Sequence, residues 1–162
     1  MKDENIRFNT IGHIEDLPGE IQKLIRNSIE DTSDNTGMIL TLALSYGGRQ
    51  EIIDAVKAIA QQVRSGQLSP EEIDSCLFES FLSTQSLPDP DLIIRTSGEK
   101  RISNFMLWQM AYTEFFNSAV LWPDFNEDYL REAIFAYQNR QRRFGHTGEQ
   151  IESAQNNTKN EL

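Results

Sequence analysis

The chain has 162 residues, with 15 Lys and Arg against 25 Asp and Glu, so its formal net charge is −10. This length predicts one domain, and the acidic balance argues against nucleic acid as a partner, because phosphate backbones are bound through a basic face. The single Cys76 excludes an intrachain disulfide and a zinc site built on several thiolates.

The first half of the chain predicts alternating strands and helices. Residues 6–11 alternate apolar and polar side chains as a strand does, and apolar residues at helical spacing follow Pro18. Residues 38–44 form an almost continuous apolar run, which is typical of a parallel strand buried on both faces. A further amphipathic pattern over 52–63 predicts a helix that ends at Gly66.

A capping-box pattern opens the next predicted helix. Residues 69–72 are Ser-Pro-Glu-Glu, and apolar residues continue at helical spacing to Phe81. These features predict a single helix over 69–81. Residues 91–95 then predict a short buried strand that ends in a charge, Arg95.

The last third of the chain predicts two helices around a strand. Residues 104–116 are apolar almost all round, which predicts a covered helix, and a carboxylate inside it, Glu114, requires an Arg or a Mg²⁺ as partner. Residues 118–122 predict a short strand, and Asn126 opens a final helix that ends at Gly145. The alternation of buried strands and helices indicates an α/β class with a mostly parallel sheet.

The segment after the strand at 91–95 is the strongest candidate for an anion site, because ligands of α/β sheets bind at the carboxyl ends of strands. Arg95 and Arg101 can each offer a planar fork of donors to phosphate oxygens, and Ser103 would point the same way as Arg101 in an extended segment. A helix starting at Asn104 would add backbone N–H groups. The alternative is a solvated loop with a salt bridge to Glu99.

Three other features carry weaker predictions. The glycines of the Tyr-Gly-Gly-Arg turn at 46–49 permit close approach to a ligand, but a tight turn needs them equally. His13 and His146 are predicted to be surface or loop histidines. The basic segment 140–145 is either a charge cluster at the end of a helix or a contact to phosphate on another subunit.

Several motifs follow one another in a fixed order between residues 6 and 145. They are YGGR at 46–49, DLIIRTSGE at 91–99, RISNF at 101–105, LWQ at 107–109, AYTE at 111–114, LWPDF at 121–125 and RRFG at 142–145. Together they resemble the cis-prenyltransferases, specifically the family of bacterial undecaprenyl diphosphate synthases. An unrelated phosphate-binding α/β module would require this agreement to be accidental.

The resemblance implies a twisted, mostly parallel sheet with flanking helices, acting as a homodimer. The implied reaction adds isopentenyl diphosphate to an allylic prenyl diphosphate, with Mg²⁺ as cofactor, to make a polyprenyl diphosphate of the undecaprenyl type. The sequence contains no apolar run of about 18 residues and no signal peptide at its start, so we expect a cytoplasmic protein. Its lipid product would allow peripheral contact with a membrane.

The resemblance also implies roles for individual residues. Arg95, Arg101 and Ser103 would bind the diphosphate of isopentenyl diphosphate, and Glu114 would ligate Mg²⁺. The segment from Arg143 to Gly145 would reach the phosphate site of the partner subunit. These roles fit the anion site expected at the end of the strand over 91–95.

One departure from the family pattern dominates the others. The family motif Asp-Gly-Asn-Gly-Arg-Trp-Ala, which holds the catalytic Asp and grips the allylic diphosphate, does not occur in this sequence. We therefore expect residues 1–145 to be the C-terminal two-thirds of the domain, with a disordered polar tail at 146–162 and no turnover by the chain alone. The alternative is a non-catalytic subunit that dimerises with a complete homologue. The sequence does not predict the product chain length.

Overall fold

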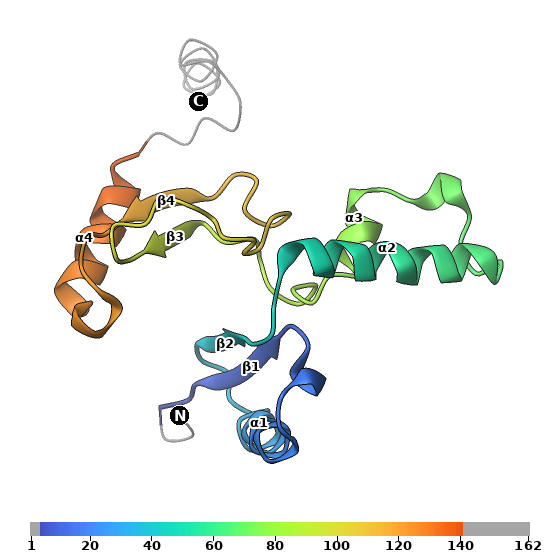
Figure 1. Cartoon of the computed structure of the whole chain (residues 1–162), viewed down its shortest axis with the longest axis horizontal. Coiled ribbons are helices and arrows are strands. Elements are labelled where there is room, and N and C mark those ends of the chain that lie inside the picture. Colours follow the sequence, from blue (N-terminus) through green and yellow to red (C-terminus); the bar gives the residue numbers. More distant parts are fainter. Residues whose placement is uncertain (1–3, 141–162) are drawn as a thin grey trace, which may run out of the picture. The chain divides into compact units, whose positions relative to one another are not determined.

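The structure, a computed structural model (Figure 1), describes residues 4–140. These residues divide into two compact units. In the described part, the first unit comprises residues 4–89 and 102–108, and the second comprises 90–101 and 109–140. Each unit contains a parallel pair of strands with a helix packed against it, so the predicted α/β class is confirmed. Gly145 and the predicted tail at 146–162 lie outside the described residues.

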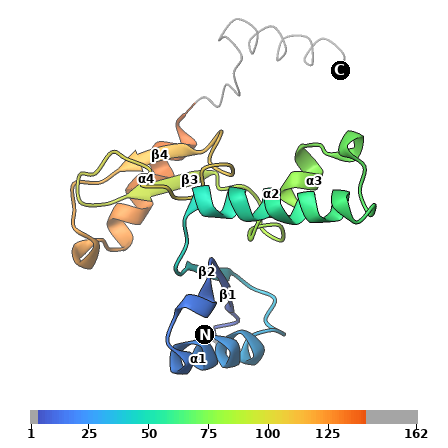
Figure 2. The ribbon, with the colours of Figure 1, turned by 45° about the vertical axis from the view of Figure 1, so that its right-hand side comes forward.

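The first unit is built on two strands that the sequence predicts. β1 (Arg7–Ile11) pairs in parallel with β2 (Ile39–Ala43), and α1 (Gly19–Asp31) packs against β1, as Figures 1 and 2 show. Phe8 and Ile11 of β1 and Ile25 of α1 are buried and form the core of this unit.

The prediction that β2 is buried on both faces is wrong. Leu40 and Leu42 share one face of the strand and remain 38% and 41% exposed. The physical reason is that α1 packs mainly on β1, so the described part of this unit leaves the apolar side chains of β2 partly covered.

The helix predicted after β2 is present and carries the most regular part of this unit. α2 (Gly48–Arg64) begins inside the Tyr-Gly-Gly-Arg turn. Ser65 is its C-cap, and Gly66 follows with φ of +73°, a left-handed conformation that favours glycine. The predicted stop at Gly66 is confirmed.

The single helix predicted over 69–81 is replaced by two shorter elements. Pro70–Glu72 forms one 3₁₀ turn, in which the Glu72 carboxylate accepts a hydrogen bond from Ser69 N at 2.7 Å. The chain then becomes extended at Asp74, whose side chain accepts from Leu77 N at 2.8 Å and starts α3 (Ser75–Glu79). A second N-cap five residues after Ser69 therefore divides the predicted helix.

The second unit contains the strand predicted at 91–95 and a partner that the sequence did not predict. β3 (Leu92–Arg95) pairs in parallel with β4 (Glu114–Asn117), and α4 (Glu127–Gln138) packs against β4 (Figures 1 and 2). Ala133 of α4 is fully buried. Asn126 caps α4 as predicted, but the helix ends at Gln138, so the predicted stop at Gly145 is wrong.

The helix predicted over 104–116 is wrong. Ser103, Asn104 and Met106 have φ of +53°, +62° and +44°, which a right-handed helix does not allow. Phe115 and Phe116 instead pair with the apolar strand β3. The strand predicted over 118–122 is also wrong, because β4 ends at Asn117 and a 3₁₀ turn begins at Trp122.

Candidate functional site

Arg95 is the last residue of β3, and the loop that follows it uses its own backbone donors internally. Ser97 and Gly98 have left-handed φ angles of +65° and +66°. Their N–H groups donate to the carbonyl oxygens of Val120 and Ser118, at 2.8 and 2.9 Å. A bound anion at this loop would therefore depend on the arginine side chains rather than on these N–H groups.

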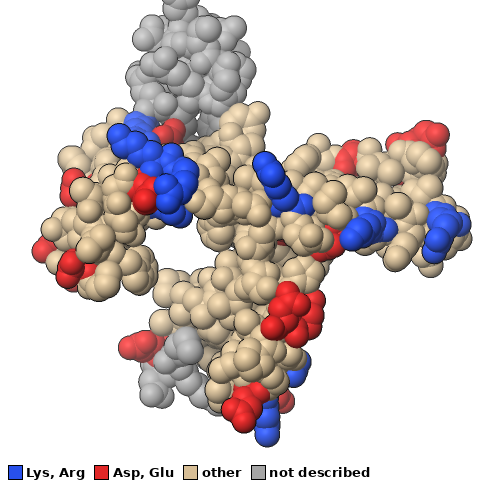
Figure 3. All heavy atoms as spheres, in the orientation of Figure 1, with Lys and Arg blue, Asp and Glu red and all other residues tan. Residues whose placement is uncertain are grey.

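Arg101 lies at the end of this loop with its side chain 67% exposed, and its guanidinium pairs with the carboxylate of Glu99. The predicted alternative, a salt bridge to Glu99, is therefore present. An exposed ion pair of this kind is weak, so a diphosphate with a higher charge would compete with Glu99 for the guanidinium. On the face drawn in Figure 3, basic side chains of this unit gather over the strand pair, with acidic side chains at their border.

Ser103 belongs to the first unit, whereas Arg95 and Arg101 belong to the second. Its φ of +53° contradicts the extended segment that the sequence predicts for this stretch. No helix begins at Asn104, so the expected contribution of a helix N-terminus at that residue is also wrong. Binding of phosphate by the side chains of Arg95, Arg101 and Ser103 stays a prediction.

Glu114 opens β4 and is paired in register with Leu92, at the opposite end of the strand pair from Arg95. Three register positions separate it from Arg95, which is about 10 Å along the strands. Its Oε2 accepts a hydrogen bond from Arg140 Nη1 at 2.7 Å, and the two side chains are 28% and 39% exposed. The expected arginine partner is present, but it follows α4 instead of coming from the loop after β3.

The donor set at Glu114 fits a Mg²⁺ ion held mainly by its substrate. Mg²⁺ prefers oxygen ligands and is often bound through one or two carboxylates together with substrate phosphates and water. Within residues 4–140 no cluster of three or more His, Cys, Asp or Glu side chains forms a metal cage. A single carboxylate at Glu114 is consistent with the first arrangement and not with an ion enclosed by protein ligands alone.

The Tyr-Gly-Gly-Arg turn is occupied by another part of the chain. A Cβ at Gly47 would lie 2.8 Å from Asn104 Nδ2, and one at Gly48 would lie 2.9 Å from Leu107 Cγ. These glycines therefore make room for the 102–108 segment, an explanation that the sequence analysis did not offer.

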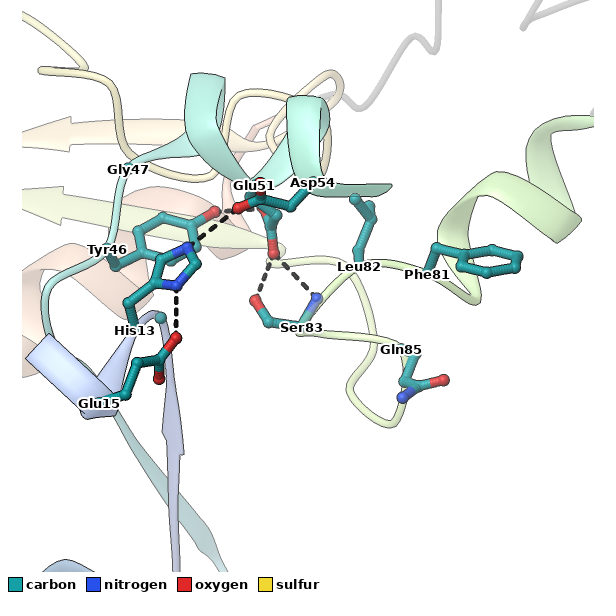
Figure 4. A pocket seen from close by; sticks show the side chains of 11 residues that line it. His13, Glu15, Tyr46, Gly47, Glu51, Asp54, Phe81, Leu82, Ser83 and Gln85 are labelled. Carbon is teal, nitrogen blue, oxygen red and sulfur yellow. Dashed lines mark hydrogen bonds and ion pairs between the residues drawn. The ribbon is translucent and has the colours of Figure 1, made fainter. Parts of the chain in front are cut away.

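The first unit contains a pocket of about 350 Å³ at the carboxyl ends of β1 and β2 (Figure 4). At its wall, buried Glu51 accepts hydrogen bonds from the Tyr46 hydroxyl at 2.6 Å and from Ser83 N at 3.0 Å, and pairs with the Ser83 hydroxyl. Sequence analysis missed this pocket, because Ser83 lies 32 residues from Glu51. The position after two parallel strands was the available signal.

His13 lies in a loop at the rim of this pocket, as predicted for a loop histidine, but it also joins two elements. Nδ1 lies 2.7 Å from Glu15 Oε1, and Nε2 lies 3.0 Å from Asp54 Oδ2 on α2 (Figure 4). The hydrogen bond with Glu15 is the main cause that raises the pKa of His13, and desolvation opposes it. A hydrogen bond from its own backbone is the main cause that lowers the pKa of Glu15, the hydrogen bond from Gln50 is the main cause for Asp54, and the contacts with His13 lower both further.

Two other predictions bear on residues that the structure does not describe. Arg143, Gly145 and His146 lie outside residues 4–140.

Among the described residues, no helix is both long and apolar enough to cross a bilayer.

Residues 1–145 match the sequence model of a protein family described as "Putative undecaprenyl diphosphate synthase". The chain belongs to this family. The match covers both strand pairs, the turn at 46–49 and the segments around Arg95, Arg101 and Glu114. The resemblance carried by the motifs is therefore confirmed.

Individual members of the undecaprenyl diphosphate synthase family resemble the chain closely. An isoprenyl transferase of Geobacter sulfurreducens is 54% identical over 151 residues, covering 93% of this chain and 61% of the relative. The ditrans,polycis-undecaprenyl-diphosphate synthase of Micrococcus luteus, specific for (2E,6E)-farnesyl diphosphate, is 50% identical over 143 residues, which are 88% of this chain and 57% of that protein.

Solved structures agree with this assignment. The crystal structure of lavandulyl diphosphate synthase from Lavandula x intermedia, in complex with dimethylallyl diphosphate, superposes with a TM-score of 0.86 at 42% identity. It covers 90% of this chain, and the chain covers 62% of that structure. The chain thus spans about 60% of the length of the relatives it matches.

Proposed function

We propose that the chain contributes the isopentenyl diphosphate site of a cis-prenyltransferase that elongates an allylic prenyl diphosphate to an undecaprenyl-type product. The observation that carries this proposal is that family membership coincides with Arg95 and Arg101 flanking the loop at the carboxyl end of β3. Two guanidinium groups near one loop are the chemistry that a diphosphate requires, because each can offer paired N–H donors to phosphate oxygens.

In this mechanism Arg95, Arg101 and Ser103 hold the diphosphate of isopentenyl diphosphate. The side chains supply fixed donors, so the acceptor stays in one orientation while its double bond meets the allylic carbon. Arg101 exchanges Glu99 for the diphosphate on binding. Electrostatic positioning of this kind requires no covalent intermediate with the protein.

Glu114 would hold the metal in the same proposal. Mg²⁺, when bound, neutralises charge on diphosphate oxygens and so assists the departure of the leaving group. Glu114 would hold the ion through its carboxylate, whose Oε2 also accepts a hydrogen bond from Arg140.

The remaining features of the proposal concern assembly. We assign residues 1–145 to the prenyltransferase domain, the range of the family match, and place 146–162 beyond it. The chain works as a homodimer or with a complete homologue, and Arg143 and Gly145 reach the partner's phosphate site. The protein is cytoplasmic, and its lipid product brings it to the membrane surface. Because the sequence has no Asp-Gly-Asn-Gly-Arg-Trp-Ala motif, the chain alone does not turn over.

The test follows incorporation of radiolabelled isopentenyl diphosphate into a farnesyl diphosphate primer with Mg²⁺. The purified chain is assayed alone and mixed with a separately expressed N-terminal segment of the Geobacter sulfurreducens relative. Activity only in the mixture is the expected result. Product from the chain alone would overturn its inactivity, and silence of the mixture would favour the non-catalytic dimerising subunit.

A binding assay separates the site from the reaction. Calorimetric titration of the chain with isopentenyl diphosphate should show binding that Arg101→Ala weakens about tenfold or more, since a hydrogen bond to a charged group contributes about 1.5–3 kcal/mol. Arg131→Ala is the matched control, because Arg131 is an exposed arginine of the same unit paired with Glu127. Equal effects of the two variants would contradict a specific role for Arg101.

A further inference from the structure

The 102–108 segment caps the N-terminus of α2 from a distance. The carbonyl oxygen of Asn104 accepts a hydrogen bond from Gly48 N at 2.7 Å, and its Oδ1 accepts from Arg49 N at 2.9 Å. The first N–H groups of a helix have no partner within the helix, and the N-cap of α2 is Gly47, which has no side chain. A residue 55 positions along the chain thus does the work of a local cap.

The backbone on both sides of Asn104 is held in a conformation that it would not adopt unaided. Ser103, Asn104 and Met106 all have φ between +44° and +62° without being glycine. Such residues persist only where surrounding contacts over-determine them, and they gather at functional sites. The two hydrogen bonds to α2 are contacts of that kind.

Packing fixes the same segment from its other side. The ring of Phe105 meets that of Tyr46 edge to face, with centroids 5.8 Å apart. Gly47 and Gly48 leave only enough room for Asn104 and Leu107. The ring contact of Phe105 and the absence of side chains at Gly47 and Gly48 therefore both fit the position of Asn104.

We propose that Asn104 is a positioning residue, which fixes Ser103 for diphosphate binding by fastening the 102–108 segment to the N-terminus of α2. This inference rests on the proposed function, since Ser103 is assigned to the diphosphate there. Asn104 itself does not touch the substrate. Its effect passes through the left-handed backbone that it shares with Ser103.

The test compares Asn104→Ala with Asn126→Ala. Both variants remove an asparagine cap from a helix, since Asn126 Oδ1 accepts from Asp128 N at 3.0 Å at the start of α4. We expect Asn104→Ala to weaken the binding of isopentenyl diphosphate in calorimetry about tenfold, the scale of a misplaced contact, and Asn126→Ala to leave it within about twofold. Hydrogen exchange at the Arg49 amide should accelerate only in Asn104→Ala.

Asn104→Gly covers the case in which the alanine variant does not fold. Glycine accepts the left-handed backbone and keeps the main-chain bond to Gly48, so it removes the side-chain amide without straining the backbone. Weaker binding by the glycine variant supports the inference. Unchanged binding by it, or equal losses in Asn104→Ala and Asn126→Ala, overturns the inference but leaves the proposed function standing. A folded wild-type chain that binds no isopentenyl diphosphate overturns the proposed function, and the inference with it.

Discussion

Arg140, two residues beyond α4, donates a hydrogen bond to Glu114, the first residue of β4, across 2.7 Å. This pair ties the end of the helix to the strand against which it packs. Because both side chains are only partly exposed, solvent screens the pair less than a fully exposed one.

We expect Arg140→Ala to lower the free energy of unfolding by about 1 kcal/mol, the upper end for pairs near the surface. Arg131→Ala should cost about 0.3–0.5 kcal/mol, since Arg131 pairs with Glu127 one helical turn away and both are about three-quarters exposed. Urea denaturation followed by circular dichroism measures both losses. A smaller loss for Arg140→Ala than for Arg131→Ala would show that the pair does not fasten α4.

Substitutions of Glu114 and of Arg140 should change the effect of Mg²⁺ differently. Glu114→Gln should abolish most of the gain in isopentenyl diphosphate affinity that Mg²⁺ provides, a loss of about tenfold or more, because a neutral amide is a poor ligand for the ion. Arg140→Ala should keep that gain, since the Glu114 carboxylate remains in place. Titrations with Mg²⁺ and with EDTA give the comparison.

If Glu114 served only to hold Arg140, both variants would lower stability alike and neither would change the effect of Mg²⁺. That outcome would remove Glu114 from the proposed metal site and leave the arginine contacts of the diphosphate untouched.

Local patterns predicted the elements whose own residues carry a distinctive pattern. Alternating apolar and polar side chains predicted the strand at 6–11, which is β1, and an apolar run predicted the strand at 38–44, which is β2. Asn126 was predicted to cap a helix, and it caps α4. The helix predicted over 104–116 was wrong, because a buried helix and a buried strand can have the same apolar composition. Pairing of Phe115 and Phe116 with β3 decides in favour of the strand, and the local pattern of 104–116 does not show this pairing.

The candidate site shows the same division. The pair of Arg101 with Glu99 could be expected, since a single residue lies between them, and it is present. Glu114 was expected to need a partner, but Arg140 stands 26 residues away and only the fold brings it there. Asn104 gave no signal at all, because its role as a remote cap depends on where α2 begins.

A pH dependence should follow from His13, whose ring nitrogens both face carboxylates. Only the imidazolium can donate to Glu15 and Asp54 together, and its pKa is raised above the ordinary 6.5, mainly by the hydrogen bond with Glu15. A pKa that is higher in the folded chain gives stability that is complete below the unfolded value and is lost as the pH rises through the folded value. Gln50 and Lys57 also face Asp54 from α2.

The measurement is the difference in melting temperature between the wild type and His13→Asn. We expect the wild type to melt higher below the ordinary imidazole pKa of 6.5, on the order of 1–3 °C, and the difference to shrink as the pH rises above that value. His146→Asn is the matched control, since it replaces the other of the two histidines. A difference that does not change with pH would mean that His13 stabilises the loop without its charge.

Alanine substitutions at two glycines of the first unit should distinguish the cost of backbone strain from the cost of a steric clash. Gly12 and Gly66 have φ of +97° and +73°, so alanine is strained at both positions. A Cβ at Gly66 meets nothing within 4 Å, whereas one at Gly12 would lie 2.3 Å from Leu44 O and 2.9 Å from Tyr46 Cβ. We expect Gly66→Ala to cost about 1–2 kcal/mol from backbone strain and Gly12→Ala to cost more, because the ends of β1 and β2 must move apart.

Urea unfolding measures both costs, and His13 provides an internal check on the cause. Gly12 precedes His13 at the rim of the pocket, so a shift there should also lengthen the contact of His13 with Asp54. Gly12→Ala should therefore weaken the pH dependence of stability, while Gly66→Ala should retain it. If Gly12→Ala lost stability but kept the full pH dependence, the displacement would be confined to the strand ends and the His13 contacts would be independent of them.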